Sequence, residues 1–186
     1  MKLCMRYIVV LCVCALVTCS APGRTKSEQK TYIDTMKTEV LSKLYKVKPD
    51  ARSEIRDAPG YAVFSNINVN VIFASVGNGF GVVINNTGGK KTYMKMGEVG
   101  IGLGLGAKDF RAVFVFQSRE VMNRFVDSGW AIGAQADAAA KAEDKGVAVG
   151  GEVVIDGIKV YQLTETGLAL QATVKGTKYW KDGYLN

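Results

Sequence analysis

The chain of 186 residues contains no histidine, and its four cysteines all lie within the first 19 positions, at Cys4, Cys12, Cys14 and Cys19. The residues after Cys19 therefore hold neither residue type. This excludes from them a Ser-His-Asp or Cys-His nucleophile, a zinc site of histidine and cysteine, histidine acid–base catalysis and a framework of structural disulfides. Carboxylates, lysines, hydroxyls and the backbone are the groups left for chemistry.

Carboxylates give no clear catalytic site either. Glu143 and Asp144 are adjacent in the charged segment 141–146, and the sequence places no companion beside them, so a solvated loop is favoured. No Asp-x-Asp-x-Asp-Gly series is present, although a calcium site of dispersed carboxylates stays open. We expect no enzymatic activity, no catalytic residue, no metal and no cofactor.

The first 18 residues have the pattern of an export signal. Lys2 and Arg6 precede an apolar run from Tyr7 to Val17 that has no charged residue. About 11 apolar residues are too few to cross a bilayer core about 30 Å thick, and they suit the core of a signal peptide. The polar, turn-forming residues that follow argue against a buried helix. We therefore predict that residues 1–18 are a signal peptide.

The residues around Cys19 indicate lipid attachment. Leu16-Val17-Thr18-Cys19 resembles the lipobox of bacterial lipoproteins, although Thr18 departs from the usual Gly, Ala or Ser. The resemblance implies a diacylglycerol and an N-acyl chain on Cys19, which together suffice for stable anchoring. Ser20 resembles the residue that directs such proteins to the outer membrane, so the periplasmic face of that membrane is the expected location. An ordinary signal peptide, cut between Thr18 and Ala21, is the alternative.

The charge of the mature chain is moderately basic. Removal of residues 1–18 takes away two of the 24 basic residues and none of the 17 acidic ones, which leaves a net charge of +5. The excess is concentrated between Arg24 and Arg56. Such a charge attracts anionic surfaces, and for an exported chain we expect phospholipid headgroups rather than nucleic acid. A solvated helix face behind a tether is the alternative.

An amphipathic helix is predicted near the start of the mature chain. Apolar residues at three- and four-residue spacing indicate a helix from Ser27, as its N-cap, to about Lys46, closed by Pro49. Residues 50–57 would add one or two turns. We expect this helix to pack on the domain, with a position on the membrane surface as the alternative. Residues 19–26 would then be a lipidated tether and residues 27–186 the domain.

Short strands are predicted for most of the rest, because the apolar period changes to two from Tyr61 onward. The first expected elements are a strand from Tyr61, a hairpin tip at 86–91, a strand pattern over 97–106, a turn at Lys108-Asp109 and a strand at 110–116. A helix capped by Ser118 and stopped by Gly129 follows, and then a strand at 130–140 and a charged loop at 141–146. The last expected elements are a hairpin of 152–155 and 158–163 across Asp156-Gly157, a strand at 168–174 and a tail that ends Tyr179-Trp180-Lys181. This order predicts an α+β fold with a mainly antiparallel β-sheet or closed barrel, an N-terminal amphipathic helix and one mid-chain helix.

Glycine is concentrated in the middle of the chain, where ten of the 21 glycines lie between Gly77 and Gly106. Within 97–106 glycines alternate with apolar residues, so one strand face lacks side chains and requires something packed close against it. The spacing in 102–106 is not that of a dinucleotide loop. Ile84 also stands where a Walker loop ending at 87–92 requires glycine, so nucleotide binding is not expected.

Several of these patterns, in this order along the chain, resemble the SYLF domain, also called the Ysc84 domain. They are 58–64 (Ala-Pro-Gly-Tyr-Ala-Val-Phe), the glycines of 77–81, the glycines of 100–106 before the strand 110–116, Phe125 with Gly129-Trp130, and 160–168 (Val-Tyr-Gln-Leu-Thr-Glu-Thr-Gly-Leu). The resemblance spans about residue 27 to residue 186. Eukaryotic members of that family are implicated in binding phosphoinositide membranes and actin filaments. The resemblance implies a lipid-interaction module without catalysis. Together with the lipobox at Cys19, it suggests a bacterial lipoprotein member of that family.

Two functions stay open for such a module. In the first, basic groups near two predicted turns bind anionic headgroups, each contributing on the order of 1 kcal/mol; the candidates are Lys90, Lys91, Lys95, Lys108 and Arg111. In the second, the domain is a structural or protein-binding element of the envelope with an unknown protein partner, and only Cys19 contacts lipid. In that case these basic residues are ordinary solubilising side chains on turns.

Overall fold

The computed structural model describes residues 20–72, 74–100, 104–132, 152–164, 167–168 and 175–186. Its helices are α2 (Lys26–Val47), α3 (Ala51–Asp57) and α4 (Arg119–Ser128). Its strands are β1 (Gly60–Ile72), β2 (Ala74–Asn85), β3 (Lys91–Gly100), β4 (Gly104–Phe116), β5 (Trp130–Ile132), β6 (Glu152–Ile155), β7 (Ile158–Thr164), β8 (Gly167–Leu168) and β9 (Lys175–Lys181). The predicted α+β class is confirmed.

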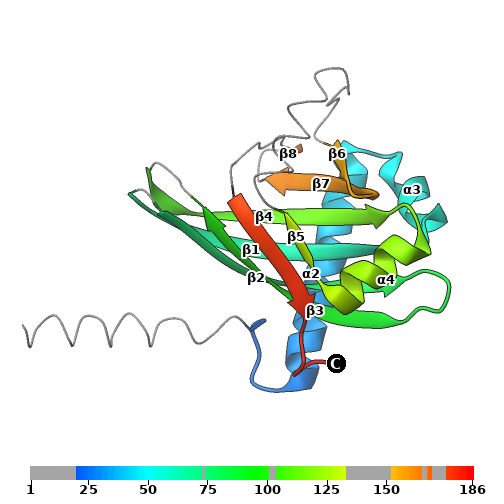
Figure 1. Cartoon of the computed structure of the whole chain (residues 1–186), viewed down its shortest axis with the longest axis horizontal. Coiled ribbons are helices and arrows are strands. Elements are labelled where there is room, and N and C mark those ends of the chain that lie inside the picture. The colour runs from blue at the N-terminus through cyan, green and yellow to red at the C-terminus, as the bar shows by residue number, and fades with distance from the viewer. Residues whose placement is uncertain (1–19, 73, 101–103, 133–151, 165–166, 169–174) are drawn as a thin grey trace, which may run out of the picture.

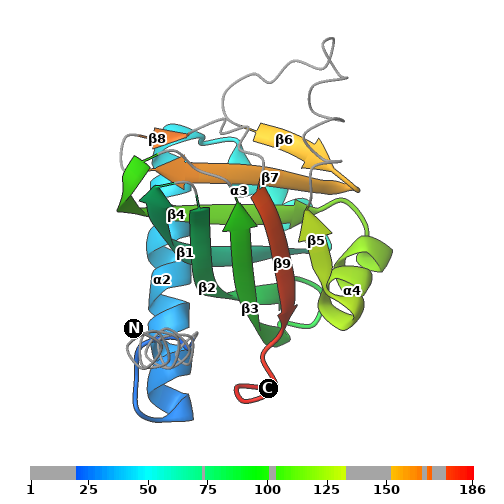
Figure 2. The same ribbon diagram turned by 60° about the vertical axis from the view of Figure 1, so that its left-hand side comes forward.

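The nine described strands form one antiparallel sheet that curls into a half-barrel (Figures 1 and 2). Eight of them follow the order β5-β9-β3-β2-β1-β4-β7-β6, and β8 pairs with β7. The long strand β1 is central, since it pairs with β2 on one side and with β4 on the other. Along the described strands β5 and β6 end the path, so the sheet is open and the predicted alternative of a closed barrel is not observed.

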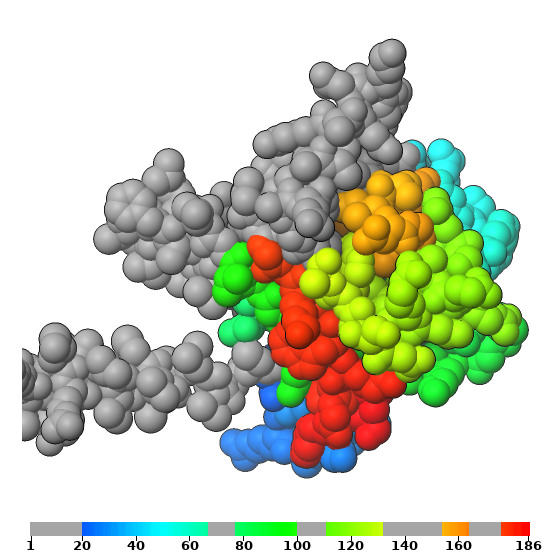
Figure 3. All heavy atoms as spheres, in the orientation of Figure 1, coloured from blue at the N-terminus to red at the C-terminus, as the bar shows by residue number. Residues whose placement is uncertain are grey.

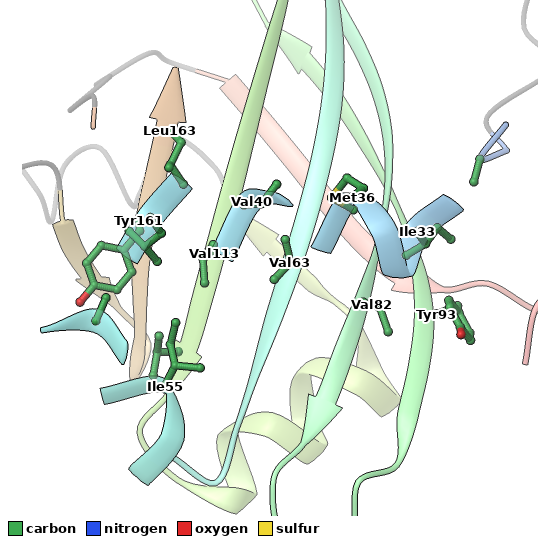
Figure 4. Packing of buried hydrophobic residues seen from close by; sticks show 14 of the residues in the cluster. Ile33, Met36, Val40, Ile55, Val63, Val82, Tyr93, Val113, Tyr161 and Leu163 are labelled. Atoms are coloured by element: carbon green, nitrogen blue, oxygen red, sulfur yellow. The ribbon is translucent and has the colours of Figure 1, made fainter. Parts of the chain in front are cut away.

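Helix α2 packs on one side of the sheet, which we call the α2 face. Its apolar stripe is buried against the strands, as the three- and four-residue spacing predicts. Figure 4 shows Ile33, Met36 and Val40 of the helix beside Val63 and Val82 of the sheet. Helix α3 adds Ile55 to the same core. The prediction that the amphipathic helix packs on the domain is confirmed.

Helix α4 packs on the other side of the sheet, which we call the α4 face. Its Phe125 joins an aromatic cluster with Phe64, Phe114, Trp130 and Tyr179, whose ring centroids lie 4.8 to 6.2 Å apart. Figure 2 shows α2 and α4 on opposite sides of the sheet. The half-barrel therefore has two apolar cores, one on each face.

The N-terminus of α2 differs from the prediction. The helix begins at Lys26 and its cap is Thr25, so Ser27 as the cap was wrong. The Thr25 hydroxyl accepts from the Glu28 amide at 3.2 Å, while the Glu28 carboxylate accepts from the Thr25 amide at 3.1 Å. This reciprocal pair satisfies two amides, whereas a serine at position 27 lacks the acidic residue three positions later that completes such a box.

The glycine-rich stretch also differs, because the pattern over 97–106 belongs to two strands. Strand β3 ends at Gly100 and β4 begins at Gly104. The turn predicted at Lys108-Asp109 was wrong, since both residues lie inside β4 and pair in register with Asn68 and Ile67 of β1. Pairing along the whole of β1 keeps this segment extended, and a local turn signal does not outweigh a ladder of that length.

Some of the other predicted elements are confirmed, and some lie outside the described residues. The tip at 86–91, the capped helix α4 and the β6–β7 hairpin across Asp156-Gly157 are confirmed, with φ angles of 54° and 77° in that turn. The predicted strand at 130–140 begins as β5, and the rest of it, the loop at 141–146 and residues 169–174 lie outside the described residues. The predicted tail 175–181 is a strand, β9, which pairs with β3 and β5.

Candidate functional site

Helix α2 leaves part of the α2 face open over β9 and over the later residues of β3. The helix packs mainly against β1, β2, β4 and β8, and on β3 it meets Lys91 and Tyr93 near the start of that strand. On the strands beyond β2 the α2 face carries two exposed apolar side chains, Val99 of β3 and Trp180 of β9, which are 64% and 36% exposed. Exposed aromatic and branched residues that gather in one place mark an interaction site more often than scattered ones do.

The strand register places three side chains of this region in one row. Phe80, Lys95 and Trp180 are direct neighbours across β2, β3 and β9. Tyr179 points into the core of the α4 face, so alternation along the strand directs Trp180 to the α2 face. Tyr32 of α2 packs edge-on against Phe80, at 5.7 Å between ring centroids, and is itself 45% exposed.

Gly97 makes room for the indole of Trp180. A Cβ atom added at Gly97 would lie 3.2 Å from Cη2 of Trp180, closer than side chains ordinarily pack. Gly97 lies between Lys95 and Val99 on the same face of β3, so the indole is placed between those two side chains. Lys178, two residues before Trp180, is exposed on that face. We call Tyr32, Phe80, Lys95, Val99, Lys178 and Trp180 the aromatic–basic surface.

The charges of this surface have defined neighbours. The Lys95 ammonium lies 3.5 Å from the buried carboxylate of Asp182, which holds its aliphatic stem along the sheet. Tryptophan and tyrosine carry an apolar body and a polar tip, and both are enriched where a membrane meets water. With lysines beside them, they suit the boundary between acyl chains and anionic headgroups.

The five cations predicted to bind headgroups do not form one cluster. Lys95 belongs to the aromatic–basic surface, and Lys90 is exposed at the β2–β3 turn. Lys91 bonds Asp34 of α2 at 2.7 Å, and this hydrogen bond raises the pKa of Lys91. Arg111 lies 3.7 Å from Glu39, also on α2. Lys91 and Arg111 therefore tie α2 to the sheet.

The remaining predicted site residues have less structural context. Lys108 is placed in β4 by its backbone, and its side chain is outside the described part. Cys19 precedes the described residues. Among the residues that the structure describes, no three or more histidines, cysteines or carboxylates come together as metal ligands. In the same part of the chain, no helix has the length and apolar character needed to cross a membrane.

A polar pair is buried on the α4 face, away from the aromatic–basic surface. The Asn66 side-chain amide donates to Glu98 Oε2 at 3.0 Å, and both side chains are buried. Burial raises the pKa of Tyr179, and the charge of Glu98 raises it further, so this phenol stays neutral at physiological pH. Asn66 and Glu98 join β1 to β3 across β2, which indicates a structural role.

Reasoning from sequence found Lys95 and missed the aromatic residues around it. The predicted tail includes Trp180, although Thr177 and Tyr179 alternate with Lys178 and Trp180 at the period of a strand. That alternation is the signal that could have identified β9. The neighbourhood of Tyr32 and Phe80 had no local signal, because their contact joins a helix to a strand far along the chain.

Comparison with known proteins shows a similarity to a bacterial protein. No family model matches the chain. The chain is 32% identical over 159 residues to the protein named beta cell expansion factor A from Aeromonas veronii. The two chains are homologous. The aligned part covers 86% of this chain and 59% of that relative, so the chain spans little more than half of the relative's length.

Proposed function

We propose that this chain is an envelope lipoprotein of the SYLF family whose non-catalytic domain binds anionic phospholipid headgroups. The observation that carries the proposal is the row of Phe80, Lys95 and Trp180, with the indole beside exposed Val99. An indole and a valine can enter the outer part of the acyl region while lysines stay among phosphates. The family assignment is supported by the homologue and by the order of the motifs along the chain.

The anchor is the second part of the proposal. Acyl chains on Cys19 would hold the domain on the periplasmic face of the outer membrane, so the aromatic–basic surface need supply little affinity of its own. A tethered surface faces lipid at a high effective concentration, and weak contacts are then enough to keep it in place. The expected ligand is the phosphate of an anionic headgroup.

A second candidate function is supported by the ion pairs of Lys91 and Arg111. Because these cations bind carboxylates of α2, fewer basic groups face solvent than the sequence indicates. This favours an envelope module that interacts with a protein and contacts lipid only through Cys19.

Vesicle flotation separates the two functions. The chain from Ser20 to Asn186, which lacks the acylated cysteine, is mixed with vesicles of phosphatidylglycerol and phosphatidylcholine or of phosphatidylcholine alone. We expect flotation with the anionic vesicles, and a loss of it in high salt, because the Debye length shrinks from about 8 Å to about 3 Å between 0.15 M and 1 M salt. Equal behaviour with both vesicle types would favour the protein-interaction module.

A further inference from the structure

The residues just after Cys19 are packed on the domain. Ala21 is 4% exposed and belongs to the same core cluster as Leu185, near the other end of the chain. An alanine with almost no exposed surface is in contact with the protein on nearly every side. Residues 21–25, which we call the N-terminal arm, are therefore packed on the domain within the stretch 19–26 that is predicted as a lipidated tether.

Polar contacts fix the arm as well. The buried Gln29 side chain donates to the Gly23 carbonyl at 3.1 Å. The Glu28 carboxylate accepts from the Arg24 amide at 2.7 Å and from the Thr25 amide at 3.1 Å. Gly23 has a φ of +134°, a backbone conformation that residues with a side chain rarely adopt. A Cβ atom there would lie 2.9 Å from the backbone nitrogen of Gln29. The arm is thus held in one conformation.

The packed arm leaves a very short connection to the lipid. Only Ser20 separates Cys19 from Ala21. Two residue steps span at most about 7 Å, so an acylated Cys19 stays within that distance of Ala21. The start of α2 must then lie at the headgroup layer. The far end of this 22-residue helix is about 33 Å from its start.

The end of the domain beside the arm suits that position. Tyr184 is 50% exposed, and the Lys26 ammonium lies 4.6 Å from the centre of its ring. Arg24 is exposed at the same end, and the Glu28 carboxylate is occupied by the two amides of the arm. Figure 3 shows the start of α2, in blue, adjoining the end of the red C-terminal segment at the lower edge of the molecule.

We propose that the N-terminal arm fixes the orientation of the anchored domain, with Arg24, Lys26 and Tyr184 against an anionic headgroup layer. The inference rests on the proposed function, because it requires an acylated Cys19. Because the arm is packed on the domain, the lipid anchor holds the domain in a fixed orientation. The ion pair of Lys95 with Asp182 places one side of the aromatic–basic surface near the same end of the domain. A phospholipid surface is favoured because exposed cations and tyrosine gather where the acylated residue must lie.

Site-specific fluorescence quenching tests this orientation. The mature acylated chain has no cysteine other than Cys19, so one added cysteine can be labelled alone. Gly183→Cys places a label beside Tyr184, at a position where an added Cβ atom meets no atom within 4 Å. Ser53→Cys places a label at an exposed position of α3. The acylated protein is reconstituted in phosphatidylglycerol–phosphatidylcholine vesicles that carry nitroxide headgroups. We expect loss of most of the fluorescence at position 183 and little loss at 53.

A linker variant shows whether the packed arm causes the difference in quenching between the two positions. A flexible Gly-Ser linker of about 12 residues between Ser20 and Ala21 lengthens the connection by about 20 Å, and the matched control carries the same linker next to exposed Gly88. In high salt, which weakens attraction to the surface, the difference between positions 183 and 53 should persist in the parent and the control and disappear in the arm variant.

The outcomes separate this inference from the function on which it rests. Equal quenching at both positions in the acylated parent, or a difference that the arm linker leaves unchanged in high salt, would overturn the fixed orientation alone. A mature chain whose intact mass shows no acyl chain on Cys19 would overturn the anchor and the orientation together.

Discussion

The indole of Trp180 lies over Gly97 of the neighbouring strand, 3.2 Å from the position that a Cβ atom would take there. The two residues belong to β9 and β3, which pair as antiparallel strands although several other strands lie between them in the sequence. The absence of one side chain on β3 thus determines where the largest exposed aromatic group of the described residues rests.

Gly97→Val should displace that indole. Branched methyl groups would occupy the space of the ring, so Trp180 becomes more exposed and its fluorescence emission moves to longer wavelength. Overpacking of this kind costs about 1 kcal/mol at a partly exposed site. Gly88→Val, in a turn where an added Cβ meets nothing within 4 Å, is the matched control. Emission that changes equally in both variants would show that the ring does not depend on Gly97.

Lys178→Gln should weaken binding to anionic vesicles about fivefold, since one basic group near such a surface contributes about 1 kcal/mol. Arg124→Gln is the control, because it removes the same charge from an exposed position on α4, on the other side of the sheet. Flotation titrations at one salt concentration measure both variants. If the two lose equal affinity, net charge rather than the aromatic–basic surface governs binding.

Leu44→Ala should destabilise the fold by about 2–5 kcal/mol, because this side chain of α2 is fully buried and its loss leaves a cavity. Val47→Ala, one helical turn later at an exposed position, should change the free energy of unfolding by less than about 0.5 kcal/mol. Urea denaturation measures both. Similar small losses would indicate that α2 does not contribute to the core in solution.

Glu54 joins α3 to β7 through two contacts. Its Oε2 accepts from the Tyr161 hydroxyl at 2.5 Å and from the Lys159 ammonium at 2.9 Å. Burial alone would raise the pKa of Glu54, but these hydrogen bonds and the charge of Lys159 outweigh burial and lower it. The folded state therefore holds the ionised carboxylate more firmly than the unfolded chain does.

Glu54→Gln should lower the free energy of unfolding by about 1 kcal/mol at pH 7, a modest amount because solvent partly screens the pair. The stabilisation is complete above the pKa of the unfolded chain and is lost as the pH falls through the lowered pKa of the folded state. The difference between parent and variant should therefore be present at pH 7 and shrink at strongly acidic pH. A difference that does not vary with pH would contradict a role for the ionised carboxylate.

Local signals predicted much of the fold. The stripe of α2, the cap at Ser118 and the Asp156-Gly157 hairpin each depend on a few neighbouring residues, and the structure has all three. The predictions were wrong where residues far away in the sequence determine the local conformation. Lys108 and Asp109 have the composition of a turn, yet β1 holds them in an extended ladder. Thr25 displaced Ser27 as the cap because Glu28 stands three residues after Thr25.

The candidate site was less predictable than the fold. Composition identified an excess of basic groups, but it could not show that Lys91 and Arg111 bind Asp34 and Glu39 of α2. Those pairs join residues that are more than 50 positions apart. Trp180 and Phe80 come together through the register of three strands, and the sequence predicts the last of these, β9, only as a tail.

Fluorescence of Trp180 with vesicles tests most directly whether the aromatic–basic surface binds lipid. In a Trp130→Phe variant of the chain from Ser20 to Asn186, Trp180 is the single tryptophan. Phosphatidylglycerol vesicles should move its emission to shorter wavelength, and lipids brominated on their acyl chains should quench it, while phosphatidylcholine vesicles do neither. Emission that stays unchanged and unquenched with anionic vesicles would contradict lipid binding by this surface.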